Sequence, residues 1–132
     1  MKKVKGFLAV LAALALLLNV SPAFAQARYS TRTSQPLESS GIFTDEDGNE
    51  MNYAVWVYGV EIFADEASSF MGVYNTTTVG AATAATVKDE IGEATQYDTA
   101  TRFYEQPRYY SSGVVGIIST GVGFVHYGPQ PK

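Results

Sequence analysis

The longest uninterrupted apolar run of the chain lies at its N-terminus, at residues 7–18. A basic start precedes it and a small-x-small ending follows it, formed by Lys2, Lys3 and Lys5 and by Pro22-Ala23-Phe24-Ala25. The run is shorter than the roughly 20 residues that cross a bilayer. This pattern is typical of a secretory signal peptide. It predicts that residues 1–25 are cleaved off after Ala25 and that the protein is secreted and acts extracellularly.

Beyond the leader, apolar and polar positions alternate with the two-residue period of β-strands. Residues 26–40 are polar and rich in hydroxyl side chains, which predicts a flexible lead-in. The pattern is strongest over Met51–Ile62, where both faces are largely apolar. It predicts a central strand in which Val55, Trp56 and Val57 are buried. Asp47-Gly48-Asn49, just before it, is typical of a hairpin turn.

The later segments read in the same way. Phe70–Thr78 and Thr95–Tyr104 have strand-like patterns, and Pro107 is expected to end the second. Val79–Thr95 is ambiguous, because its alanines favour a helix whereas its glycines and threonines do not. We expect two strands there, joined by a turn at Lys88-Asp89-Glu90. Val114–Tyr127, rich in glycine and β-branched residues, predicts an apolar hairpin in preference to a membrane-active helix.

These segments predict an all-β fold, a small antiparallel β-sandwich of about six to eight strands. The predicted organisation is a signal peptide over 1–25, a lead-in over 26–40, a single β domain over 41–128 and a short tail over 129–132.

The composition of the chain argues against several classes of function. Loss of the leader removes three lysines and leaves six basic residues against 13 acidic ones, a net charge of about −7. Binding to nucleic acids, anionic membranes or wall teichoic acids is therefore disfavoured. The chain has no cysteine, which excludes thiol catalysis and favours a bacterial exported protein over a eukaryotic one.

The sequence gives little support for a catalytic function. His126 is the only histidine, and no serine lies in a Gly-x-Ser-x-Gly turn. We expect no enzyme and no cofactor, with a small secreted hydrolase as the third hypothesis. One oxygen-rich cluster offers a weak calcium candidate, formed by Asp45, Asp47, Asn49 and Glu50. Its spacing departs from an EF-hand loop, and a solvated hairpin tip is the competing interpretation.

Tyrosine is unusually frequent, and all nine tyrosines follow the leader. Tyr104, Arg108, Tyr109 and Tyr110 bracket Pro107 and form the predicted binding surface for an unknown protein or glycan partner, since tyrosine and arginine are enriched at interfaces. The alternative is that these rings pack across strands on the exposed side of a sheet. Edge strands such as Val122–Tyr127 offer a further route to self-association.

Three short segments, Trp56-Val57-Tyr58-Gly59-Val60, Val73-Tyr74-Asn75 and Ala84-Ala85-Thr86-Val87, resemble the secreted, cysteine-free β-sandwich bacteriocins of the lactococcin type. The histidines common in that family are absent at the comparable places, and this mature chain is longer. The first hypothesis is a non-catalytic binding or structural protein at the cell surface or in the surroundings. The resemblance implies the alternative, a secreted antibacterial effector.

Overall fold

The computed structural model describes residues 31–130. The predicted signal peptide, its cleavage site and the first part of the expected lead-in lie outside these residues.

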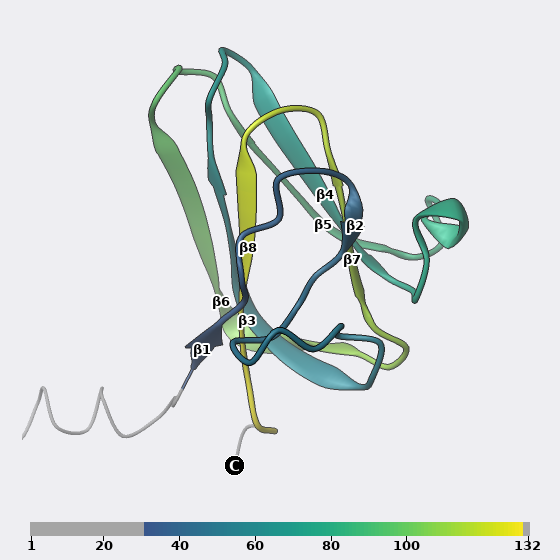
Figure 1. The fold of residues 1–132 in the computed structure, drawn as a ribbon. Helices are drawn as coiled ribbons and strands as arrows, with labels where there is room; N and C mark the ends of the chain where they lie inside the picture. The colour runs from purple at the N-terminus through teal and green to yellow at the C-terminus, as the bar shows by residue number, and fades with distance from the viewer. Residues whose placement is uncertain (1–30, 131–132) are drawn as a thin grey trace, which may run out of the picture. The chain divides into compact units, whose positions relative to one another are not determined.

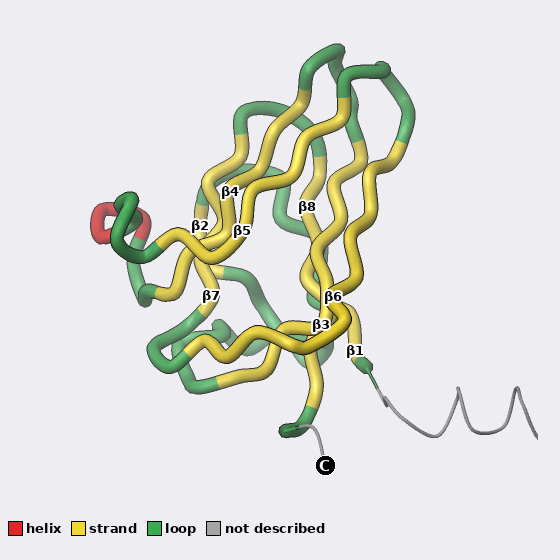
Figure 2. Tube along the Cα trace, turned by 180° about the vertical axis from the view of Figure 1, so that it is seen from behind, coloured by secondary structure: helices red, strands yellow, loops and turns green. Residues whose placement is uncertain are grey.

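The described chain forms two antiparallel four-stranded sheets packed face to face, which confirms the predicted small β-sandwich (Figure 1). Sheet A has the strand order β1-β8-β3-β6 and sheet B the order β2-β7-β4-β5. The strands are β1 (Arg32–Thr33), β2 (Gly41–Ile42), β3 (Val55–Phe63), β4 (Ser69–Asn75), β5 (Val87–Glu93), β6 (Thr99–Tyr110), β7 (Val114–Ile118) and β8 (Val122–Gly128). A single 3-10 turn, η1 (Val79–Ala81), stands away from the sheets (Figure 2).

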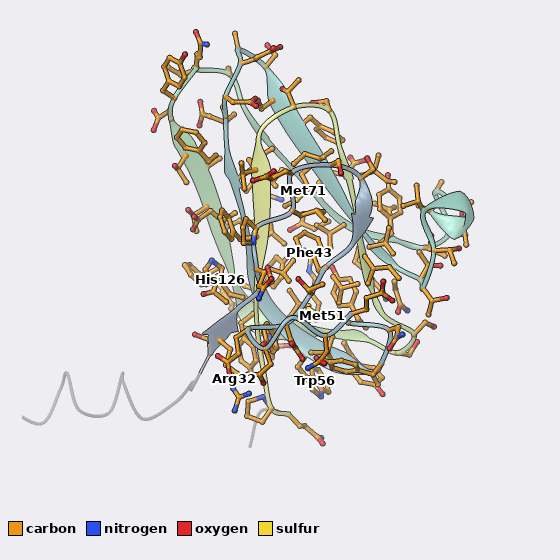
Figure 3. All side chains as sticks on the ribbon, viewed as in Figure 1. Arg32, Phe43, Met51, Trp56, Met71 and His126 are labelled. Carbon is orange, nitrogen blue, oxygen red and sulfur yellow. The ribbon has the colours of Figure 1, made fainter. Side chains whose placement is uncertain are left out.

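The core consists of the inward-facing side chains of both sheets. Phe43, Met51 and Met71 are fully buried between them (Figure 3). Val55 and Val57 are buried, as the alternation predicts. Trp56 is not enclosed, because it lies on the outer face of sheet A, where only part of its ring is covered. The expectation of a strand with both faces covered therefore holds for only one face at this position.

Residues 31–42, which we call the strap, run along one side of the sandwich. β1 pairs with β8, and β2 pairs with β7, so the strap joins the edge of sheet A to the edge of sheet B (Figure 1). Between them, the main-chain N–H and C=O of Leu37 bond to Gly123, both at 2.9 Å. The described part of the expected flexible lead-in is thus paired along β8, because its main chain satisfies the edge of that strand.

Two local expectations are wrong. Lys88-Asp89-Glu90 lies within β5 rather than at a turn, because Asp89 faces inward between apolar neighbours. β7 and β8 are not a hairpin: residues 119–121 carry the chain from sheet B to sheet A.

The segment Val122–Tyr127, expected to be an edge strand open to self-association, does not lie at the edge of a sheet. β8 lies between β1 and β3, and Leu37 pairs with Gly123 near its start. Within residues 31–130, β5 and β6 are the long strands that end the two sheets. No helix among these residues has the length and apolar character needed to cross a membrane.

Candidate functional site

β6 carries most of the candidate residues and is interrupted by a large bulge. Val57 pairs with Arg108, but Gly59 pairs with Phe103, so residues 104–107 lie opposite a single residue of β3. Such a bulge changes the direction of a strand and of the side chains on it. Both strands bend here (Figure 2). β6 therefore presents different sets of side chains before, within and after the bulge.

Pro107 lies within this bulge and does not end the strand. The expectation that it would is wrong, because β6 resumes at Arg108 and continues to Tyr110. Proline is tolerated at a bulge, where its missing N–H removes no ladder hydrogen bond.

Asp89 is the centre of a polar cluster that joins the two sheets. Its side chain, on β5 of sheet B, is only 5% exposed. Arg102 Nη1 donates to its Oδ1 at 2.7 Å, Arg108 Nη1 lies 3.8 Å from the same oxygen, and the Tyr104 hydroxyl donates to its Oδ2 at 2.5 Å. The three partners all lie on β6 of sheet A. We call these four residues the clasp.

Further contacts fix the β6 side chains of the clasp. Arg102 Nη1 also donates to the Glu90 carbonyl at 3.1 Å, and Arg108 donates to the Lys88 carbonyl. The Arg108 guanidinium stacks 4.3 Å above the centre of the Tyr104 ring. Burial, followed by the hydrogen bond to Asp89, raises the pKa of the Tyr104 hydroxyl well above its usual value of 10. Tyr104 is therefore a neutral donor at physiological pH.

An open depression of about 390 Å³ lies beside the clasp. It is lined by Val87, Lys88, Asp89, Glu90 and Arg102. The described residues contain four lysines and arginines, and three of them are Arg102, Arg108 and Lys88. A strongly acidic chain thus gathers most of its described cations at one seam between the sheets.

A second surface, the aromatic face, lies on the outer side of sheet A and consists of Trp56, Phe103 and Tyr109. The Trp56 and Tyr109 rings are 4.9 Å apart between centres and are tilted by 39°. Phe103 is 62% exposed, with its ring 4.8 Å from that of His126. Gly59 makes room beneath Phe103, because a Cβ at Gly59 would lie 2.7 Å from the phenylalanine Cδ1. Tyr109 is 47% exposed, so two large rings on this face remain accessible.

The four residues predicted to bind a partner do not share one surface. Tyr104 and Arg108 belong to the clasp, Tyr109 belongs to the aromatic face, and Tyr110 is fully buried in the core. The alternation along β6 places Tyr109 on the opposite face from Arg108 and Tyr110, since neighbouring side chains point to opposite faces of a sheet. Burial raises the pKa of the Tyr110 hydroxyl above its usual value. That hydroxyl has no hydrogen-bond partner among the described residues.

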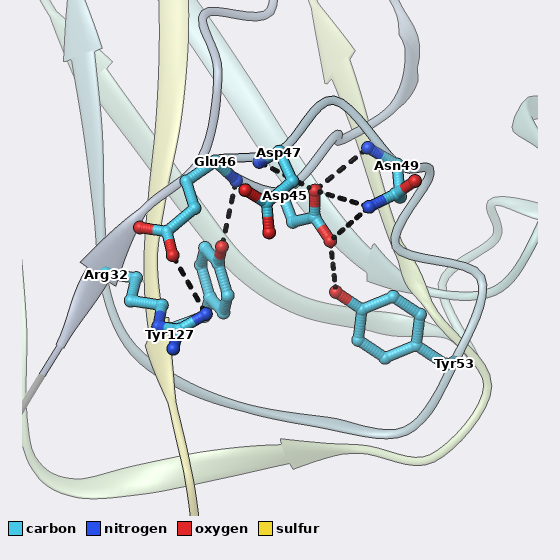
Figure 4. Close-up of polar contacts among 7 residues, drawn as sticks. All are labelled: Arg32, Asp45, Glu46, Asp47, Asn49, Tyr53 and Tyr127. Carbon is cyan, nitrogen blue, oxygen red and sulfur yellow. Dashed lines mark hydrogen bonds and ion pairs between the residues drawn. The ribbon is translucent and has the colours of Figure 1, made fainter.

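The calcium candidate forms a closed hydrogen-bonded turn (Figure 4). Asp45 Oδ1 accepts the N–H groups of Asp47 at 3.0 Å and of Asn49 at 2.8 Å. Its Oδ2 accepts the Tyr53 hydroxyl at 3.2 Å, and the Asn49 amide donates to both oxygens. Gly48 adopts a φ of +85°, as the predicted turn requires. Glu50 pairs through its backbone with Thr44.

The hydrogen bonds and charges of this turn shift the pKa values of two of its side chains, Asp45 and Tyr53. The hydrogen bond from the Asn49 backbone is the main reason that the pKa of Asp45 is lowered. Burial and the nearby Asp45 charge raise the pKa of Tyr53 to about 12. Between residues 31 and 130, no group of three or more histidine or acidic side chains is placed to hold a metal ion. The turn is also tied to the sandwich, since Arg32 pairs with Glu46 at 2.8 Å and the Glu46 N–H bonds to the Tyr127 hydroxyl (Figure 4).

His126 links three strands of sheet A on its outer face. Its Nδ1 lies 3.1 Å from the Thr33 hydroxyl, and its Nε2 lies 3.4 Å from Glu61 Oε2. The Nε2 contact has an ion-pair distance but not hydrogen-bond geometry. Glu61 also accepts the Thr101 hydroxyl at 3.3 Å. The ring is 14% exposed beneath Phe103, so these contacts hold β1, β8 and β3 together.

Sequence reasoning missed Asp89 and Arg102, the closest ion pair of the clasp. The signal was present in β5, where Val87, Asp89 and Ile91 alternate with Lys88 and Glu90. A carboxylate at an inward position between two apolar residues requires a cationic or hydrogen-bonding partner.

Comparison with protein-family models, curated proteins and solved structures finds no match to this chain.

Proposed function

We propose that this chain is a secreted bacterial protein with a non-catalytic role, and that it binds a surface ligand outside the cytoplasm through the aromatic face. The observation that carries the proposal is the exposure, on the outer side of sheet A, of Phe103 and of Tyr109, whose ring packs against Trp56. Exposed aromatic rings gathered on one face mark a binding surface, because they bury a large area at low entropic cost.

The remaining polar groups support binding rather than catalysis. Asp45, Asp89 and His126 each have side-chain or main-chain neighbours that account for their placement. His126 is covered by Phe103 and lies outside the depression. The predicted leader supports a location outside the cytoplasm, where a cell-surface protein or glycan is the available partner.

Co-sedimentation of the exported protein with whole bacterial cells and with purified cell walls tests this function. We expect binding, and we expect Phe103→Thr combined with Tyr109→Thr to reduce it by at least about tenfold, as loss of interface anchors does. The matched control is Tyr97→Asn, which removes a 71% exposed ring elsewhere at a residue with φ of 64°. Asparagine tolerates that backbone conformation.

Three results would contradict the proposal. One is equal binding by the double variant and the control, which would place the surface elsewhere. Another is clearing of bacterial lawns by the purified protein, which would favour the antibacterial effector. The third is an exported form that retains residues 7–18, detected by intact mass, which would imply an anchored chain.

A further inference from the structure

We infer that the depression beside the clasp is a second binding site, which takes the carboxylate-bearing ring of an acidic saccharide. The carboxylate is expected to bind Arg102 and Lys88, while Glu90 accepts hydroxyl groups of the same ring. This inference does not depend on the aromatic face, because the depression lies at the seam between β5 and β6 and shares no residue with that face.

Arg102 has one edge of its guanidinium left for a ligand. Its Nη1 makes both contacts within the protein, to Asp89 and to the Glu90 carbonyl. Among the described residues, Nε and Nη2 have no partner, and the side chain is 51% exposed. These two nitrogens form the fork that binds a carboxylate through two parallel hydrogen bonds. Asp89 holds the guanidinium in place, so this edge is oriented before a ligand arrives.

Lys88 is a second cation among the residues that line the depression. Its side chain is exposed and forms no ion pair within residues 31–130. The only carboxylates in the lining are Asp89, which the clasp already uses, and Glu90. These two carboxylates balance the charges of Lys88 and Arg102, so the lining offers two exposed cationic side chains at no net charge on an otherwise acidic chain.

Glu90 is the reason to choose a saccharide. Its exposed carboxylate belongs to no ion pair in the described chain, and it would repel a ligand that carries only negative charge. It is instead a good acceptor for hydroxyl groups. A uronic acid presents a carboxylate and several hydroxyls on one ring, which matches this combination of cations and acceptor. An acidic peptide lacks the hydroxyls, and a polyanion would meet the net negative charge of the chain.

The size of the depression fits a small ligand. A volume of about 390 Å³ lies at the lower end of the range of small-molecule sites. The depression is open, so a sugar unit within a longer chain can enter without a free end. Val87 provides a small apolar contact for the carbon face of a ring.

Two-dimensional ¹H–¹⁵N NMR titration of the exported protein tests the inference, with glucuronate, glucose and acetate as probes. We expect glucuronate to shift the amides of Lys88 to Glu90 and the Arg102 Nε signal. We expect an affinity at least about tenfold higher than for glucose or acetate, because only glucuronate uses both the fork and the acceptor. Equal binding of acetate would reveal a general anion site and overturn the inference. Equal binding of glucose, or no shift with glucuronate, would overturn it as well.

Arg102→Lys keeps the charge but removes the fork, and it should weaken glucuronate binding about tenfold. The matched control is Arg32→Gln, which removes an arginine paired with Glu46 away from the depression and should bind normally. If Arg102→Lys fails to fold, Lys88→Gln provides the same test, since this exposed side chain is outside the clasp. Wild-type affinity in a folded variant of either kind would contradict the inference. Absence of cell binding by the wild-type protein, with its glucuronate binding intact, would reject only the proposed role of the aromatic face.

Discussion

The two open sides of this sandwich are closed in different ways. On one side, the strap pairs with β8 and β7 mainly through main-chain hydrogen bonds. On the other side, β5 and β6 end their sheets, and the side chains of the clasp connect them. Main-chain closure leaves few functional groups to spare, whereas the clasp places arginines at the surface. The difference explains why the depression lies at the β5–β6 seam.

The largest expected effect comes from removing residues 31–40, which are most of the strap. A chain that starts at Gly41 loses the main-chain bonds that Ser34 and Leu37 make to β8, together with the packing of Leu37 on the core. Each bond contributes about 0.5–1.5 kcal/mol, so the bonds and the packing of Leu37 together approach the lower end of the roughly 5–15 kcal/mol that stabilises a small domain. We expect the chain to be largely unfolded by circular dichroism.

The control for this deletion starts at Thr31 and keeps the whole strap. It should unfold at the same urea concentration as the exported form. A stable fold in the chain that starts at Gly41 would show that the strap covers the edges without supporting them, and the proposed contrast between the two sides would fail.

The clasp should contribute less than the strap. Asp89→Ala leaves the Tyr104 hydroxyl without its acceptor, but Arg102 and Arg108 are exposed enough to be hydrated. We expect the free energy of unfolding to fall by about 1–3 kcal/mol, the cost of one unsatisfied buried group. Urea denaturation measures this change. Glu90→Ala, at an exposed neighbouring carboxylate, is the control and should change stability by less than about 0.5 kcal/mol. Equal effects of the two substitutions would show that Asp89 contributes no more to stability than an exposed carboxylate, which would contradict its role as the centre of the clasp.

Alkaline pH should weaken the clasp side selectively. The pKa of Tyr104 is raised in the folded state, chiefly by burial and then by the hydrogen bond to Asp89. Below pH 10 the hydroxyl is protonated in both states, and its contribution is fully present. Above pH 10 the unfolded chain loses this proton first, so stability falls as the pH rises. Tyr53, with a pKa of about 12, and Tyr110 add to the same trend.

Tyr104→Phe isolates the clasp in that titration. The free energy of unfolding, measured from pH 8 to pH 11, should decline less steeply in the variant than in the wild-type protein. Tyr97→Phe, on an exposed ring, is the control and should leave the slope unchanged. A wild-type slope in Tyr104→Phe would mean that the hydroxyl ionises as easily in the folded protein as in the unfolded chain.

The two sides of the sandwich also differ in how far they can be predicted from the sequence. The alternation over β3 and β4 predicted strands, because a buried face forces a two-residue period. Residues 31–40 of the strap are expected to be flexible, since main-chain pairing leaves no apolar pattern in residues 31–36. Lys88-Asp89-Glu90 resembles a turn because three consecutive charged residues are typical of exposed loops, and they obscure the alternation around Asp89. Its partners on β6 could not be identified from one sequence, because their proximity depends on how two sheets pack.

The smallest expected effect is the response to salt. An increase from 0.05 to 0.5 M sodium chloride should lower the free energy of unfolding by a few tenths of a kcal/mol, because ions screen exposed charge pairs. The pair of Arg32 with Glu46 should account for more of this change than the pair of Arg102 with Asp89, because salt screens a buried pair much less than an exposed one. Asp89 is 5% exposed, whereas both members of the strap pair are about half exposed. Arg32→Gln should therefore reduce the salt response more than Arg102→Gln does. The reverse order would show that the contact between Arg102 and Asp89 is as open to solvent as a surface ion pair, and it would contradict the assignment of a buried side-chain closure to the β5–β6 side.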